Sequence, residues 1–272
     1  MIYTNIMMTK SDTQNKTKKG RIKWIPSILG IMLLLLIWHL ACSFGKINAY
    51  VLPSPEKVAK TFIKILKNGE IAWDIGISLL RVMKGFGIAF ILAFVLAAFR
   101  VFLPALEPWY SFSVQFFRNV PPISMIPLLI LWCGIGETTK TVIIVLASFF
   151  PMYLSIVKGF TGADPKLLEV GKAFSYGKGR LFLRVILPCA IPDILIGMRT
   201  SLGYAWRAII GAEMVAASTG LGHMILFAQQ MSRTDKVIIG ICVIGLIGLV
   251  TDFILGTVIR LITMQTSGNG WE

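Results

Sequence analysis

The sequence predicts an all-α polytopic membrane protein with about six transmembrane helices. Of its 272 residues, 56% are hydrophobic and 15% are charged, and the mean hydropathy is +0.76. A soluble domain carries about 25% charged residues, and a disordered chain has low hydrophobicity. Apolar runs of about 20 residues recur along the chain, which is the length that a helix needs to cross a hydrocarbon core. Soluble and disordered classes are therefore excluded.

The charge balance is strongly basic, with a net charge of +14 at pH 7. The Lys and Arg residues lie mostly between the apolar runs, which is typical of loops at lipid headgroups, so no nucleic-acid partner is expected. The 13 acidic residues and two histidines are scattered. We therefore expect no metal, no cofactor and no catalytic residues. The four cysteines form no C-x-x-C pair and are interpreted as reduced structural thiols.

The N-terminal part combines a basic tail with a first apolar run. Residues 1–23 are polar and basic, which places them in the cytoplasm, and 24–44 form the first transmembrane helix. The apolar run is too long for a cleavable signal peptide, and a small-residue exit site is not evident. The expected location is therefore the cell membrane, with several spans.

Residues 45–77 are predicted to form an extracellular amphipathic segment. Ser54 and Pro55 are typical of a helix start, and Asn68-Gly69 of its end. One side of this helix carries lysines and another is apolar, as in a helix that lies on a membrane surface. The lysines are Lys57, Lys60, Lys64 and Lys67. Their extracellular placement conflicts with the positive-inside rule.

The membrane domain is expected over 78–262, with further spans at 79–103, 112–134, 139–160, 190–213 and 237–262. Six helices with a cytoplasmic N-terminus place the C-terminal tail, 263–272, in the cytoplasm as well. The span at 112–134 contains Arg118, Pro121 and Pro122. Broken helices at membrane depth are tolerated where they are buried or line an aqueous cavity, so this span is predicted to be kinked and to face a pore.

The longest polar connection, 161–189, is expected on the cytoplasmic side. Asp164 and Pro165 begin a helix that continues to about Phe174. Its apolar or flat side is predicted from Leu167, Leu168, Gly171 and Phe174. After the turn at Gly177 we expect a second short helix at right angles to the first, with Leu181, Phe182, Val185 and Ile186 on one face.

This connection resembles the EAA signature of type I ABC importer permeases. Glu169, Val170 and Gly171 occupy the Glu-Ala-Ala places and Ser175 the glycine place, and Val185, Leu187 and Pro188 follow at the Ile-x-Leu-Pro places. The segments SLLRVMKGFGIAF, RNVPPISMIPLLILWCGIGE and AWRAIIGAEMVAASTGLGHMI are similar to the nitrate/sulfonate/taurine branch. The resemblance covers about 78–262.

The resemblance implies the permease subunit of an ATP-driven importer for a small, anionic solute. It implies a homodimer, an ABC ATP-binding subunit docked on each copy and an extracellular substrate-binding protein. The implied docking residues are Asp164, Leu168, Glu169, Val170, Gly171, Phe174, Ser175, Gly177, Leu187 and Pro188. The sequence has no G-x-x-x-x-G-K-[ST] phosphate loop, so ATP hydrolysis is expected on the partner.

The fifth predicted span carries a stripe of candidate pore residues. Arg199, Gly203 and Arg207 recur every four residues, and Glu213 follows. An ionisable side chain at membrane depth tends to face a cavity or a partner, and arginine suits oxyanions. The alternative is that each arginine pairs with a nearby carboxylate, such as Glu213 or Asp193, or with a backbone carbonyl. Asp252 in the sixth span has the same two interpretations.

Other functions remain open at this point. The cargo of such an importer could also be a thiamine- or riboflavin-related nutrient. A self-sufficient channel or secondary transporter would show inverted repeats and paired broken helices, whereas only one broken helix is evident, near Pro121-Pro122. A membrane enzyme would need a cluster of His, Cys or carboxylates, which the sequence does not show.

Overall fold

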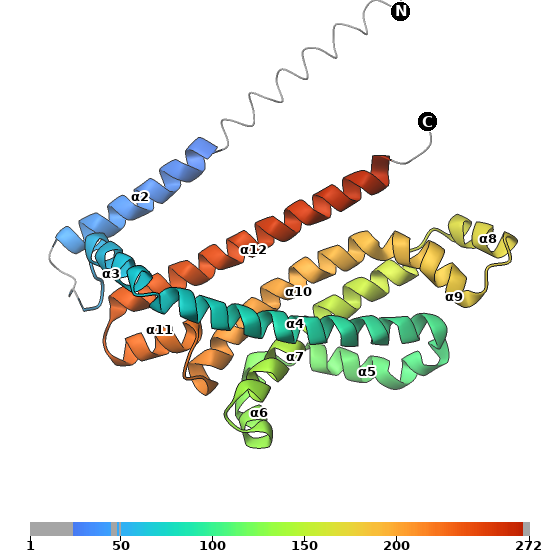
Figure 1. The fold of residues 1–272 in the computed structure, drawn as a ribbon, viewed down its shortest axis with the longest axis horizontal. Helices are drawn as coiled ribbons and strands as arrows, with labels where there is room; N and C mark the ends of the chain where they lie inside the picture. The colour runs from blue at the N-terminus through green and yellow to red at the C-terminus, as the bar shows by residue number, and fades with distance from the viewer. Residues whose placement is uncertain (1–23, 45–47, 49, 269–272) are drawn as a thin grey trace, which may run out of the picture.

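The computed structural model describes residues 24–44, 48 and 50–268, and its regular structure there is helical throughout (Figure 1). The predicted basic tail, 1–23, lies outside these residues. Within these residues, four helices are long and apolar enough to cross a membrane: Glu70–Phe102, Glu137–Thr161, Lys178–Ala216 and Thr234–Ile262. A bent pair, Pro104–Arg118 and Pro122–Cys133, adds a fifth candidate. The all-α membrane prediction is confirmed.

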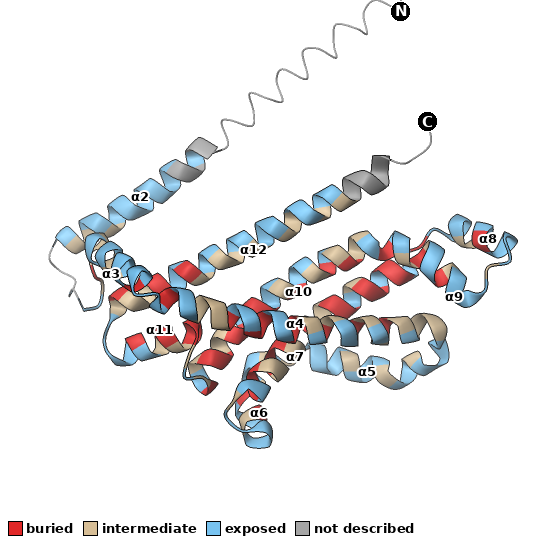
Figure 2. Ribbon diagram, in the orientation of Figure 1, coloured by how far each residue is buried: buried red, intermediate tan, exposed pale blue. Residues whose placement is uncertain are grey.

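Helices α4 (Glu70–Phe102), α7 (Glu137–Thr161) and α10 (Leu187–Ala216) form the centre, with α7 packed against both others. Small residues allow the close approach. A Cβ added to Gly197 of α10 would come within 2.5 Å of the Ser155 Cβ on α7, and one on Gly85 within 2.6 Å of Ile144. Figure 2 shows the buried residues concentrated along these helices.

Two hydrophobic clusters fill the described part of the chain. One lies around Ile143, Ile209 and Leu221 and joins α4, α7, α10 and α11 (Leu221–Gln230). The other lies towards the opposite end of α7, where the Phe160 and Phe182 rings meet edge to face at 5.0 Å between centroids. The central helices are therefore held together at both ends.

The predicted amphipathic helix is present as α3 (Pro55–Lys67). The Ser54 hydroxyl accepts a hydrogen bond from the Lys57 amide at 3.3 Å, and Asn68 ends the helix as expected. Ile65 is buried, while the four lysines are exposed. Helix α2 (Trp24–Ser43) coincides with the first predicted span; it contacts α3, and its apolar stretch Leu29–Ser43 is shorter than the other candidate spans.

The predicted kink in the third span is confirmed. After the short turn Pro104–Leu106, α5 (Glu107–Arg118) ends before Pro121, and Pro122–Met125 leads into α6 (Ile126–Cys133). The two halves are bent by 92°. Because neither Pro121 nor Pro122 has an amide hydrogen to donate, the helical ladder stops there. The broken helix begins at 104, earlier than the predicted start at 112.

The second short helix of the 161–189 connection is not a separate element, so that prediction is wrong. Helix α8 (Pro165–Ala173) is separate, but α9 (Lys178–Leu181), a π-helical turn at Phe182–Ile186 and α10 form one helix of 39 residues. Pro188 cannot bond to the carbonyl of Arg184, and the wider π turn directly before it absorbs that mismatch. The fifth span therefore begins before the predicted 190.

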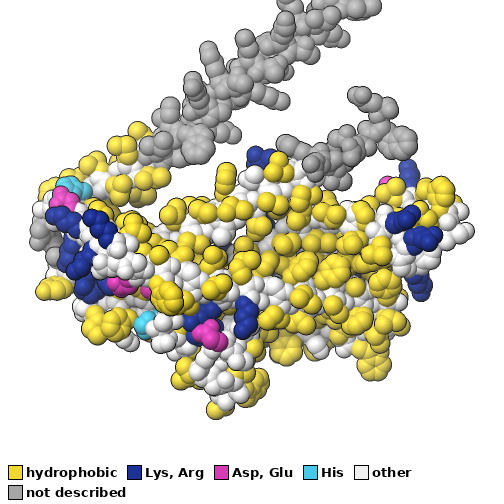
Figure 3. Space-filling model, in the orientation of Figure 1, with side chains coloured by type: hydrophobic (Ala, Val, Ile, Leu, Met, Phe, Trp, Pro, Cys, Tyr) yellow, Lys and Arg dark blue, Asp and Glu magenta, His cyan; other side chains and the backbone are white. Residues whose placement is uncertain are grey.

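Helix α12 (Thr234–Gly268) also exceeds its predicted span and continues into the range assigned to the C-terminal tail. It packs on α10, α11 and α3. Figure 3 shows hydrophobic side chains over the middle of one face, with Lys and Arg gathered mostly towards the α3 end and the α8 end. This distribution suits a molecule whose middle lies in lipid.

Candidate functional site

Helix α8 with its C-terminal turn, residues 164–177, forms a projecting tip at one end of the molecule, which we call the α8 tip (Figure 1). The Asp164 carboxylate accepts a hydrogen bond from the Lys166 amide at 2.9 Å and so caps the helix. Gly171 is buried, and a Cβ added there would lie 2.5 Å from the Leu181 side chain, so α8 approaches the next helix closely at this residue. The tip is thereby anchored to the long helix that contains α9 and α10.

The turn after α8 has the hydrogen bonds of a Schellman motif. The Ser175 amide donates to the Lys172 carbonyl at 2.8 Å, and the Tyr176 amide donates to the Gly171 carbonyl at 3.0 Å. Ser175 itself has φ of +56°, a conformation in which glycine carries no steric penalty. This geometry is a physical reason for a glycine in the place that Ser175 occupies.

The apolar face of α8 is divided between the protein and the outside. Leu168 packs on the second cluster, whereas Leu167, Val170 and Phe174 are exposed, Phe174 by 71%. The predicted face of Leu167, Leu168, Gly171 and Phe174 therefore does not turn inward as a unit. Exposed apolar side chains gathered on a projecting polar tip are typical of a protein contact. Glu169, Gly177 and Pro188 are exposed, and Leu187 is partly buried.

A groove of about 470 Å³ lies between α8 and the start of α10. Val170, Phe174 and Tyr176 form one wall, and Arg184 and Pro188 belong to the other. The Arg180 and Arg184 guanidinium groups each lie 5.8 Å from the centroid of the Tyr176 ring, at cation–π distance. The groove thus joins apolar walls to a cationic rim.

The arginine stripe of α10 lies on an exposed face, but its members have different partners. The Arg199 guanidinium pairs with the Asp252 carboxylate of α12 at 2.5 Å. Arg207 lies over the Tyr204 ring at 5.8 Å, and within the described residues no carboxylate pairs with it. Gly203 lies beside both in a cavity of about 510 Å³. Arg199 thus pairs with a carboxylate, as the alternative stated, but with Asp252 in place of Asp193 or Glu213.

Glu213 is placed away from the other stripe residues, in a buried network. Its side chain is fully buried and accepts hydrogen bonds from Ser78 at 2.8 Å, the Gly222 amide at 2.9 Å and Arg81 at 2.8 Å. Arg81 also binds Glu137 with two nitrogens, at 2.9 and 2.7 Å. The network joins α4, α7, α10 and the turn before α11.

Three side chains of these sites were not predicted as site residues from the sequence. Arg81 is the centre of the Glu213 network, and its only sequence signal was a charge inside an apolar run. Arg118 lines a largely apolar cavity of about 430 Å³, beside the helix break that its neighbours predicted. Tyr176 is recognisable as a site residue only in the structure, where the turn brings its ring within 5.8 Å of the Arg180 and Arg184 guanidinium groups.

Comparison with known proteins identifies relatives of the whole membrane domain. The family model described as "Binding-protein-dependent transport system inner membrane component" matches residues 85–263. The putative aliphatic sulfonates transport permease protein SsuC of Bacillus subtilis is 35% identical over 239 residues, which cover 88% of this chain and 87% of that protein. The taurine transport system permease protein TauC of Escherichia coli is 28% identical and covers 91% and 95%.

Solved structures share the fold. An inward-facing form of the MetNI methionine ABC transporter matches with a TM-score of 0.60 and 17% identity, covering 74% of this chain and 98% of that one. An amino acid ABC transporter crystallised with histidines matches with a TM-score of 0.61 and 15% identity, covering 73% and 97%. The predicted type I ABC importer permease fold is confirmed.

Proposed function

The chain belongs to the family of binding-protein-dependent transport system inner membrane components, and we propose that its cargo is a small anionic organic solute of the aliphatic sulfonate class. The observation that carries the proposal is Arg207, a cation on an exposed face of α10 with no carboxylate partner among the described residues. Arginine donates paired hydrogen bonds that match an oxyanion. The names of the sulfonate and taurine relatives point to the same head group.

We further propose that the pore lies along α10, at Arg199, Gly203 and Arg207. Glycine at 203 leaves open space, since a Cβ there would meet nothing within 4 Å. The Arg199–Asp252 pair supplies a polar but balanced wall. Glu213, a further candidate from the sequence, would act from a distance, because its network fixes the end of α10.

The energy is proposed to enter from a separate ABC ATP-binding subunit that docks on the α8 tip. The exposed side chains of Val170 and Phe174 and the groove beside them provide an apolar surface at an end of the molecule. A short helix capped by Asp164 and anchored at Gly171 is a rigid lever. In this arrangement the remaining docking residues, Glu169, Ser175 and Gly177, surround the contact.

Docking of that subunit places the α8 end in the cytoplasm and the α3 end outside. Both termini are then cytoplasmic, and an extracellular substrate-binding protein delivers the solute at the α3 end. Two copies of the chain are proposed to enclose one pore, since exposed α10 residues need either water or a second copy beside them at membrane depth. Substrate-binding protein and homodimer follow the family's organisation.

Uptake of a radiolabelled short-chain alkanesulfonate tests the solute in the native host. Deletion of the chain is expected to abolish uptake, and the wild-type chain on a plasmid to restore it. Unlabelled taurine is expected to compete, whereas thiamine and riboflavin are not. Restored uptake of thiamine or riboflavin with no uptake of sulfonate would replace the proposed cargo by the nutrient class.

A further inference from the structure

A cavity of about 430 Å³ lies where the broken helix, α7 and α10 meet, and we call it the central cavity. Its volume falls in the range of small-molecule sites, about 300–1,000 Å³. It lies against one side of the middle of α7, from Leu146 to Leu154. The lining residues are Arg118, Val120, Pro122, Ile123, Leu146, Ala147, Phe150, Pro151, Leu154, Tyr204, Arg207 and Ala208.

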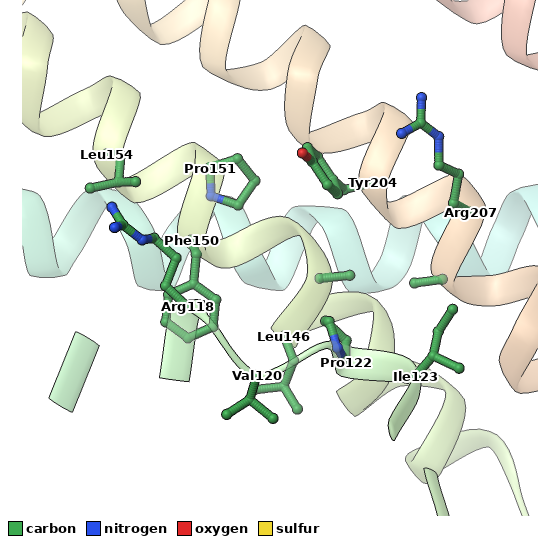
Figure 4. A pocket seen from close by; sticks show the side chains of 12 residues that line it. Arg118, Val120, Pro122, Ile123, Leu146, Phe150, Pro151, Leu154, Tyr204 and Arg207 are labelled. Carbon is green, nitrogen blue, oxygen red and sulfur yellow. The ribbon is translucent and has the colours of Figure 1, made fainter. Parts of the chain in front are cut away.

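The lining combines two cations with apolar side chains. Figure 4 shows Arg118 beside Phe150 and Leu154 at one edge of the cavity and Arg207 at the opposite edge, with its guanidinium group directed away from Arg118 and with Pro151 and Tyr204 between the two arginines. Within the described residues, no carboxylate pairs with either arginine. Two uncompensated cations on an otherwise apolar wall favour an anion, because an unpaired charge at membrane depth is costly.

The helix break supplies a second, independent observation. Val120 and Pro122, which flank the interruption between α5 and α6, are part of the cavity wall. Non-helical backbone at membrane depth is tolerated only where it is buried in protein or lines a water-filled cavity. Val120 is only partly buried and Pro122 is half-buried, so the break opens onto this space.

We propose that the central cavity binds one aliphatic sulfonate, with the sulfonate group at Arg118 and the hydrocarbon chain against Phe150, Pro151 and Leu154. Arg207, at the opposite edge, adds to the positive potential that draws the anion in. The proposal rests on the proposed function and assigns it a site. Arg199 does not take part, because Asp252 already holds its guanidinium group. The apolar wall selects an organic anion over inorganic sulfate, whose charged oxygens would lose water on every side without replacement.

Thiol modification tests the cavity without any transport. In a chain whose native cysteines are replaced by serine, Ile123→Cys places a thiol on the cavity wall. The probes are 2-sulfonatoethyl methanethiosulfonate, itself an ethanesulfonate, and the cationic 2-(trimethylammonium)ethyl analogue. We expect the anionic probe to react about 10-fold faster, because a cavity lined by positive charges raises the local concentration of anions. The reference is a chain that retains only Cys133, at the far end of α6.

Combining Ile123→Cys with Arg118→Gln and Arg207→Gln is expected to abolish that preference while the Cys133 reference keeps its rates. Equal rates for the two probes in the chain with both arginines would overturn the proposal. So would a thiol at 123 that reacts with neither probe, because the cavity would then be closed to water.

Uptake measurements distinguish a failure of this site from a failure of the proposed function. Arg118→Gln is expected to raise the half-saturating alkanesulfonate concentration about 10-fold, since it removes a charge-assisted hydrogen bond. Arg207→Gln is expected to raise it by a smaller factor, since it removes only part of the positive potential. The matched control is Arg100→Gln, which removes a paired arginine of the same α4–α5 region but lies outside the cavity. Wild-type uptake by both cavity variants would overturn the site and leave the function standing. A wild-type chain that imports no sulfonate would overturn the function, whatever the thiol rates.

Discussion

Glu213 shows how one side chain of a membrane helix can hold several elements together. The carboxylate is fully buried and satisfied by Ser78, Arg81 and the Gly222 amide, while Gly220, with φ of +109°, leaves room beside it. A buried charge of this kind is tolerated because it is paired and hydrogen-bonded. Its role at this scale is structural, since it fixes the end of α10 to α4 and to the start of α11.

Removal of the Glu213 charge is expected to destabilise the protein strongly. Glu213→Gln leaves Arg81 with one carboxylate partner fewer, and breaking a buried pair costs about 3–5 kcal/mol. Thermal unfolding of the purified chain in detergent measures the effect. The control is Asp193→Asn, which breaks the exposed pair with Lys158 at a cost of about 1 kcal/mol or less. Equal shifts for the two variants would contradict the structural role.

Ser175 is the residue at which strain is stored in the α8 tip. Ser175→Gly relieves a left-handed conformation that costs a side-chain-bearing residue about 1 kcal/mol. We expect amide hydrogen exchange in α8 to slow about 5-fold, because local opening becomes less favourable by that amount. Ser175→Ala keeps the Cβ and is expected to bring no such protection. A similar slowing in both variants would show that conformational strain at this position is not the cause.

The crossing of α7 and α10 depends, at the scale of elements, on residues with almost no side chain. Gly197 faces Ser155, and Gly159 faces Ala190, where an added Cβ would come within 2.9 Å. Between membrane helices there is little hydrophobic driving force, so close packing of small residues takes its place. The π-helical turn at Phe182–Ile186 acts at the same scale, because it lets one helix continue past Pro188 from the α8 tip to Arg199 and Arg207.

Gly197→Ala is expected to destabilise the protein by about 1–3 kcal/mol, since the new methyl group overlaps Ser155 and the helices must separate. The control is Gly87→Ala in α4, where a Cβ meets nothing within 4 Å. Helix propensity favours alanine there by about 0.5–1 kcal/mol. Thermal unfolding in detergent compares the two, and a stabilising Gly197→Ala would refute the close-packing explanation.

The whole molecule has a broad apolar surface between two polar ends, with the α8 tip at one end and the exposed lysines of α3 at the other (Figure 3). This polarity suits the proposed arrangement, in which energy and cargo enter from opposite sides. The long helix that contains α9 and α10 runs from the groove beside α8 to the central cavity and the Glu213 network. A movement of the tip can therefore reach the proposed pore residues through one continuous helix.

Docking on the α8 tip is expected to fail when its exposed apolar surface is charged. Phe174→Asp together with Val170→Asp introduces two desolvated charges into the proposed contact, so the ABC ATP-binding subunit should no longer co-purify from native membranes. The control is Trp132→Asp, an exposed apolar residue of α6, a helix that lies away from the α8 end in Figure 1. Retention of the subunit by the tip variant would place the docking surface elsewhere.

The sequence by itself was sufficient for the features that depend on local spacing. Such features depend on neighbours within one or two helical turns. They are the caps at Ser54 and Asp164, the face of lysines on α3, the break at Pro121-Pro122 and the spacing of the EAA-like residues. Such features were predicted within a few residues, because capping, proline and helical periodicity act over that range.

Only the tertiary structure decided which charges remain unpaired. Asp252 lies 53 residues from Arg199 and Arg81 lies 132 residues from Glu213, so their pairing depends on which helices pack together. The same packing brings Arg118 to the cavity that Arg207 lines. Ion pairs between distant helices have no local pattern, since their energy is realised only when the helices are in contact and water is excluded.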